Sequence, residues 1–193
     1  MLRGLLRRHC HTRYGLDSKY VIRETQHAQT LEMNEHEKNL DLLDETDFEL
    51  ITNIITKEEE TELVNECNIL FKRRRYQNGH WDDVILKYKE IEKTLEQWEN
   101  PMVLESLQKV HGFLPTTLVY LPKVHVIDLA SDGYIKPHVD SIKFSGELVA
   151  GLSLASSCLL QFTNDSSSSP VDTITVLLPP RSMYIMRCVF IYF

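Results

Sequence analysis

The chain has 193 residues, of which 42% are hydrophobic and 25% are charged, as in an ordinary soluble globular protein. This length accommodates one domain with a sizeable core and is too short for two. The formal net charge is −7, and residues 1–23 contribute +5 through six basic residues and Asp17, so the remainder carries −7 − 5 = −12. Such an acidic body argues against broad binding to nucleic-acid phosphates and leaves room only for a local basic groove.

The N-terminal segment is basic and amphipathic. Its first 16 residues hold four arginines and no acid, and Leu2, Leu5 and Leu6 share one helical face. This pattern predicts a mitochondrial transit peptide over residues 1–23, with a disordered basic tail as the alternative. Residues 24–47 are polar and acid-rich and predict a flexible linker. No stretch of the chain is long and apolar enough to predict a membrane span.

Two amphipathic helices are predicted near the start of the folded domain, residues 48–193. Thr56 and Glu59 have the spacing of a capping box, in which each side chain bonds the other residue's backbone N–H. The apolar stripe that follows predicts a helix over residues 57–71. Asn100-Pro101 begins a second, weaker helix, because proline suits the first turn, where its missing donor would be unpaired anyway.

Short strands follow from about Val119 onward. Alternating or β-rich segments are separated by turn chemistry such as Ser131-Asp132-Gly133 and Pro179-Pro180. They predict strands over residues 124–129, 134–140, 148–154, 158–163, 173–178 and 183–186. Helices first and strands after predict an α+β chain built on a β-sandwich or barrel.

His138 and Asp140 are candidate metal ligands. Two positions apart in a strand, they would project from one face, and an imidazole nitrogen and a carboxylate oxygen suit the same metal. Iron(II) oxygenases with two histidines and one carboxylate need such a pair. The pattern alone leaves a structural role open. A second His-x-Asp pair, His80 and Asp82, lies in a polar segment and is interpreted as structural or surface. His125 and Asp128 are three apart and poor partners for one metal.

Three longer stretches resemble the AlkB family of Fe(II)/2-oxoglutarate dioxygenases. They run over residues 133–144, 150–154 and 178–186, and the Arg-rich start and residues 73–82 resemble the mitochondrial branch. The resemblance implies a double-stranded β-helix, or jelly roll, with the helices packed on it and with His138 and Asp140 as iron ligands. It also implies that Tyr184 contacts the cosubstrate 2-oxoglutarate, since a phenol can donate one hydrogen bond to a carboxylate.

The family also carries a second iron histidine and an arginine clamp for 2-oxoglutarate in later segments. No histidine follows His138 in this sequence, and Arg181 and Arg187 match turn or strand positions rather than the clamp. We therefore expect a C-terminally truncated jelly roll that binds iron and cosubstrate weakly and is catalytically inactive by itself. Unpaired strand edges would favour aggregation.

The resemblance implies hydroxylation or demethylation of a protein or RNA substrate in the mitochondrial matrix, with the acidic body favouring protein. By resemblance only, this branch is linked to programmed necrosis and fatty-acid metabolism. We expect a monomer. The alternatives are a non-catalytic binding or regulatory module on the same scaffold and an unstable fragment without a function of its own.

Overall fold

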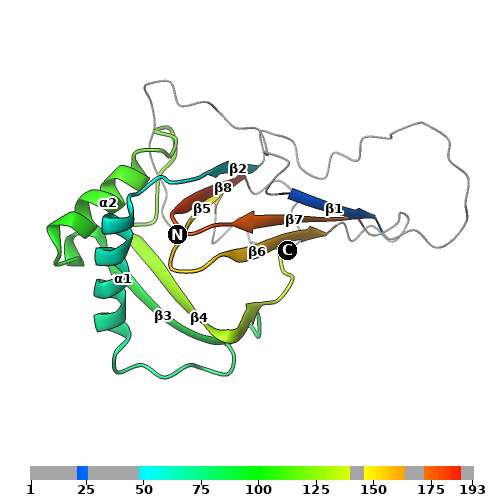
Figure 1. Cartoon of the computed structure of the whole chain (residues 1–193), viewed down its shortest axis with the longest axis horizontal. Helices are drawn as coiled ribbons and strands as arrows, with labels where there is room; N and C mark the ends of the chain where they lie inside the picture. Colours follow the sequence, from blue (N-terminus) through cyan, green and yellow to red (C-terminus); the bar gives the residue numbers. More distant parts are fainter. Residues whose placement is uncertain (1–20, 26–47, 140–145, 164–171, 188–193) are drawn as a thin grey trace, which may run out of the picture.

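The computed structural model describes residues 21–25, 48–139, 146–163 and 172–187. Two helices and a 3-10 turn lie among eight strands in these ranges (Figure 1). The helical elements are α1 (Lys57–Phe71), η2 (Leu95–Gln97) and α2 (Pro101–His111). The strands are β1 (Val21–Thr25), β2 (Phe48–Ile51), β3 (Ile85–Thr94), β4 (Lys123–Ile135), β5 (Leu148–Ser153), β6 (Cys158–Thr163), β7 (Asp172–Leu178) and β8 (Ser182–Arg187).

Both predicted helices are confirmed. α1 begins at the predicted capping box: the Thr56 hydroxyl accepts from the Glu59 N–H at 3.1 Å, and the Glu59 carboxylate accepts from the Thr56 N–H at 2.6 Å. α2 begins after Asn100, whose side chain accepts from the Met102 N–H at 3.0 Å, with Pro101 in the first turn. Each helix buries one apolar stripe, made of Leu63, Cys67 and Phe71 in α1 and of Val103, Leu107 and Val110 in α2.

Two antiparallel three-stranded sheets pack face to face. Their strand orders are β2-β8-β5 and β1-β7-β6. One side of the first sheet meets the second sheet, and the other side meets α1 and α2 (Figure 1). Alternation along β5 makes both contacts possible, because Val149 faces the second sheet while Leu148 and Ala150 face the helices. The arrangement is α+β, strand-rich and compatible with a β-sandwich, and the jelly-roll connectivity stays a prediction.

β3 and β4 form a separate two-stranded ribbon. β4 runs without a break from Lys123 to Ile135, so the turn expected at Ser131-Asp132-Gly133 is wrong. These residues have no partners in β3. Between the pairs Tyr88–Leu129 and Leu86–Tyr134, residues 130–133 of β4 lie opposite Lys87 alone, so the turn-prone segment forms a bulge within β4. β4 then ends at Ile135, two residues before Pro137, which has no N–H to extend a ladder.

The N-terminal part is described only at β1. This strand pairs with β7, Val21 opposite Val176 and Thr25 opposite Asp172, and spans the expected boundary between residues 1–23 and 24–47. The other residues of the expected transit peptide and linker lie outside the described residues, and both assignments stay predictions. None of the helices in the described ranges has the length and apolarity that a membrane crossing requires.

Candidate metal and cosubstrate site

His138, the first candidate iron ligand, is half-buried and lies three residues beyond the end of β4 rather than within a strand as predicted. Its Nδ1 atom is 2.9 Å from the backbone carbonyl oxygen of Lys136. A carbonyl can only accept a hydrogen bond, so in the neutral ring Nδ1 carries the proton and Nε2 carries the lone pair. Metal-binding histidines are commonly oriented by such a bond to a backbone carbonyl. The tautomer that this hydrogen bond implies therefore fits a ligand that binds through Nε2.

The segment that carries His138 is held at the end of the β3–β4 ribbon by a backbone hydrogen bond and an ion pair. The backbone N–H of Lys136 donates to the carbonyl of Val84 at 2.8 Å, and its ammonium group lies 2.5 Å from the Asp83 carboxylate. These bonds fix where the chain leaves β4. Asp140, the second candidate ligand, lies outside the described residues, so its pairing with His138 stays a prediction.

Tyr184, the candidate cosubstrate residue, lies in β8 on the side that faces the β1-β7-β6 sheet. It is half-buried and packs against the core between the two sheets. Its ring stacks on Phe48 of β2, with centroids 6.3 Å apart and an interplanar angle of 9°. Its cross-strand neighbour in β5 is Gly151. Tyr184 is thus held by both neighbouring strands, in the interior layer rather than on the outer surface.

The second His-x-Asp pair has a structural explanation. His80 Nδ1 lies 2.7 Å from Asp82, whose carboxylate also accepts from the Val84 N–H at 3.0 Å. The bond from that N–H, followed by the one from His80, lowers the pKa of Asp82. The His80 ring lies between Trp81 and Tyr88, with centroids at 5.4 and 5.8 Å. The pair therefore closes the turn before β3.

His125 and Asp128 have separate partners, as expected of residues that share no metal. His125 Nε2 lies 2.9 Å from Glu90, whereas Asp128 accepts from the Tyr76 hydroxyl at 2.9 Å and lies 3.5 Å from the Lys89 ammonium group. Across the ranges that the structure describes, no three or more His, Cys, Asp or Glu side chains gather in a way that could hold a metal ion. Asp140 is outside those ranges.

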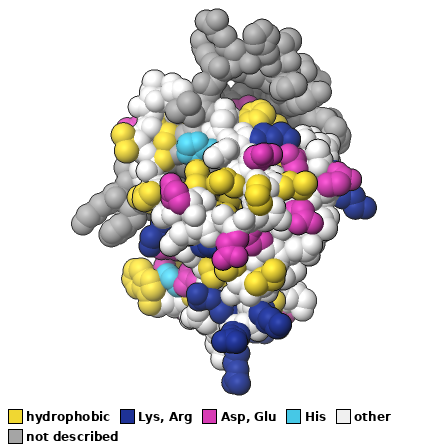
Figure 2. All heavy atoms as spheres, turned by 90° about the vertical axis from the view of Figure 1, so that its left-hand side faces the viewer, with side chains coloured by type: hydrophobic (Ala, Val, Ile, Leu, Met, Phe, Trp, Pro, Cys, Tyr) yellow, Lys and Arg dark blue, Asp and Glu magenta, His cyan; other side chains and the backbone are white. Residues whose placement is uncertain are grey.

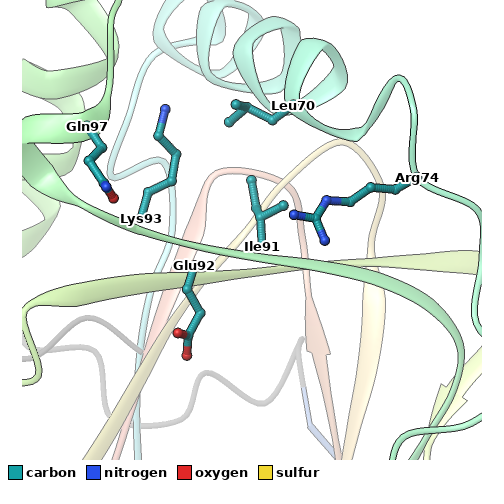
Figure 3. Close-up of a pocket in the computed structure, with 6 residues that line it drawn as sticks. All are labelled: Leu70, Arg74, Ile91, Glu92, Lys93 and Gln97. Atoms are coloured by element: carbon teal, nitrogen blue, oxygen red, sulfur yellow. The ribbon is translucent and has the colours of Figure 1, made fainter.

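The surface beside the helices is electrostatically mixed. Figure 2 shows this face, where acidic and apolar side chains alternate and basic ones gather toward one end. A pocket of about 240 Å³ opens between the end of α1 and β3 (Figure 3). It is lined by Leu70, Arg74, Ile91, Glu92, Lys93 and Gln97 and includes none of the predicted site residues.

The strand-rich fold is compatible with the class of protein that the sequence motifs predict, and the comparison with known proteins supports the resemblance to the AlkB-like family. It is 38% identical over 133 residues to the mouse protein named alpha-ketoglutarate-dependent dioxygenase alkB homolog 7, mitochondrial. It is 42% identical over 132 residues to the bovine protein of the same name.

These matches cover 69% and 68% of the chain, respectively, and the chain spans 58% of the length of each of these relatives. A third relative, an uncharacterised protein of Acanthamoeba polyphaga mimivirus, is 26% identical over 152 residues, which are 72% of this chain and 67% of the viral protein. No family model matches the chain.

Proposed function

We propose that the protein is a mitochondrial Fe(II)/2-oxoglutarate dioxygenase of the AlkB type. The observation that carries this proposal is the identity of 38% and 42% with two mammalian proteins whose names state both the cosubstrate dependence and the mitochondrion. The residues of this chain that would bind the metal are His138 and Asp140. Tyr184 would bind a carboxylate of 2-oxoglutarate. The matrix is the compartment that a cleavable N-terminal targeting segment would serve.

The described residues support these roles through orientation. The Lys136 carbonyl holds the His138 ring in the tautomer that leaves a lone pair on Nε2. Tyr184 lies in the interior layer between the sheets, where a phenol donates more strongly to a carboxylate than it would in bulk water. Iron with 2-oxoglutarate and O2 supplies the family's oxidising chemistry, in which a substrate is hydroxylated while succinate and CO2 form.

The proposed substrate is a protein or an RNA, and the reaction is hydroxylation or, at an N-methyl group, demethylation. The charge of −12 outside residues 1–23 favours a protein, because an acidic surface repels phosphates. The proposed links to programmed necrosis and fatty-acid metabolism rest on the resemblance alone. With His138 and Asp140 as the proposed ligands, we expect weak iron binding and little turnover by these 193 residues alone. A non-catalytic binding or regulatory module on the same scaffold is the second candidate function.

Titration with Mn(II), a redox-inert substitute for Fe(II), tests the proposed metal ligands. Paramagnetic broadening or calorimetry should detect a site that His138→Ala and Asp140→Ala each weaken by at least about tenfold. The matched control is His80→Ala, which removes the histidine of the other His-x-Asp pair and should leave the affinity unchanged. Equal affinity in the wild type and in both site variants would refute the assignment.

Succinate formation separates the two candidate functions. Succinate that depends on Fe(II) and 2-oxoglutarate and is lost in His138→Ala would support the dioxygenase. Metal binding without any succinate would support the non-catalytic module.

A further inference from the structure

The ring of Tyr184 lies directly over a glycine of the neighbouring strand. Gly151 is its cross-strand partner in the β5–β8 pairing. A Cβ atom placed on Gly151 would lie 2.5 Å from Cζ and 2.6 Å from Oη of Tyr184, and closer still to Cε1. Carbon atoms in van der Waals contact are about 3.5 Å or more apart. Any residue other than glycine at position 151 therefore displaces the phenol end of this tyrosine.

Aromatic packing also restrains the ring. Phe48 of β2 stacks on it, and Phe48 in turn meets Phe162 of β6 edge to face, with centroids 5.3 Å apart. Phe48 and Phe162 are both almost completely buried, at 2% and 1% exposed. β2 and β5 flank β8 on opposite sides, so the tyrosine packs against neighbours on both adjoining strands. A displaced ring would have to disturb this packing.

We propose that Gly151 is a positioning residue for the cosubstrate. By leaving space above β5, it lets the Tyr184 hydroxyl take the position from which it donates a hydrogen bond to a carboxylate of 2-oxoglutarate. This inference rests on the proposed function. It adds a residue that touches no ligand and acts only through Tyr184.

Binding of 2-oxoglutarate in the presence of Mn(II), measured on the full chain by calorimetry or ligand-observed NMR, tests the inference. Tyr184→Phe keeps the ring and removes the donor, so it should weaken binding by roughly tenfold or more. Gly151→Ala should produce a similar loss. In the double variant the two losses should not add, because both act through one hydroxyl.

A second measurement follows the ring itself. With tyrosine labelled with carbon-13 at Cζ, the resonance missing from Tyr184→Phe is that of Tyr184, and it should shift in Gly151→Ala. Where Gly151→Ala lowers the melting temperature, the double variant Gly151→Ala/Tyr184→Leu should melt at a higher temperature than Gly151→Ala, because it lacks the ring that clashes with the added Cβ. Gly79→Ala is the glycine control: its Cβ would meet nothing closer than Leu86 Cδ2 at 3.4 Å, and we expect normal binding.

These measurements distinguish failure of the positioning role of Gly151 from failure of the proposed function. Wild-type affinity in Gly151→Ala, an unmoved Tyr184 resonance or fully additive losses would overturn the positioning role and leave the proposed function standing. A wild-type chain that binds no 2-oxoglutarate would overturn both, and the wild-type titration alone reveals that outcome.

Discussion

The Glu60 carboxylate in the first turn of α1 accepts a hydrogen bond of 3.0 Å from the backbone N–H of Ala155, in the turn between β5 and β6. Its second oxygen lies 3.7 Å from the Arg181 guanidinium, in the turn between β7 and β8. Ala155 and Arg181 both adopt left-handed backbone, with φ of 65° and 64°. One carboxylate thus joins α1 to two turns whose conformations are costly for residues with side chains.

Glu60→Ala should lower the free energy of unfolding by about 1–3 kcal/mol, because it leaves the Ala155 N–H without its acceptor. Glu60→Gln keeps an acceptor oxygen and should lose less. Urea unfolding of the three proteins measures both differences. A loss in the alanine variant no larger than in the glutamine variant would mean that the bond to Ala155 contributes nothing.

Glu66 is a buried anchor between α1 and the start of α2. Its carboxylate accepts from the N–H groups of Glu99 at 2.9 Å and Asn100 at 3.2 Å, and lies 3.5 Å from the Lys93 ammonium group. The side chains of Glu66 and Lys93 are only 10% and 13% exposed. Glu66→Ala should lower the free energy of unfolding by about 3 kcal/mol, because it leaves the nearly buried Lys93 ammonium group and two backbone N–H donors without their partner.

The matched variant for this site is Lys93→Met, which removes the cation but leaves Glu66 both backbone donors. It should cost less than Glu66→Ala in the same denaturant series. The reverse order would show that the ion pair, and not the capping of α2, dominates at this position.

Gly133 lies in the bulge of β4, close to the backbone of β3. A Cβ atom there would lie 2.5 Å from the carbonyl oxygen of Lys87 and 2.9 Å from the amide nitrogen of Ala130. Both are backbone atoms and cannot rotate away. Gly133→Ala should therefore destabilise the protein by about 2 kcal/mol or more. Gly79→Ala, whose Cβ would make only ordinary van der Waals contacts, should be neutral or slightly stabilising through the unfolded chain. Equal effects in thermal unfolding would contradict the close approach.

Cys67 should resist thiol reagents until the protein unfolds. Burial, with a smaller contribution from Glu66, raises the pKa of this thiol from 9.0 to about 12. Cys158 is exposed. In a chain with Cys10 and Cys188 replaced by serine, a maleimide at pH 8 should label Cys158 first and Cys67 only at a rate that denaturant increases. Labelling of both at equal rates in the native protein would refute this.

The raised pKa of Cys67 also makes the free energy of unfolding depend on pH. A thiol pKa that is higher in the folded state than in the unfolded state favours folding while the group is protonated. The contribution is complete below pH 9, the unfolded value, and is lost as the pH rises toward about 12. Cys67→Ala should flatten the decline in unfolding free energy over this interval, and an unchanged slope would contradict the assignment.

Local patterns predicted the elements that local interactions make. The capping box at Thr56 and Glu59 and the Asn100-Pro101 start gave helices over the observed ranges. The strand over residues 158–163 is confirmed, and the observed β5, β7 and β8 lie within one residue of the predicted ends. In each case the signal is an alternation or a cap contained in a few neighbouring residues.

β3 had no such signal. Its buried residues Tyr88 and Ile91 are three apart, and Leu95 follows four residues later, a spacing typical of a helix rather than of the two-residue alternation of a strand. The Ser131-Asp132-Gly133 segment was misleading because turn-forming residues also suit a bulge. Only the pairs on either side, Leu129 with Tyr88 and Tyr134 with Leu86, show that the strand continues beyond it.

The sequence by itself provided the resemblance to the AlkB family, the two helices and the candidate residues His138, Asp140 and Tyr184, because these depend on residue types and on short spacings. The tertiary structure decided which atoms orient His138 and Tyr184. The Lys136 carbonyl behind His138 depends on where β4 ends, and the glycine beneath Tyr184 depends on the β5–β8 register. Strand register joins residues far apart in the chain, so no local pattern contains it.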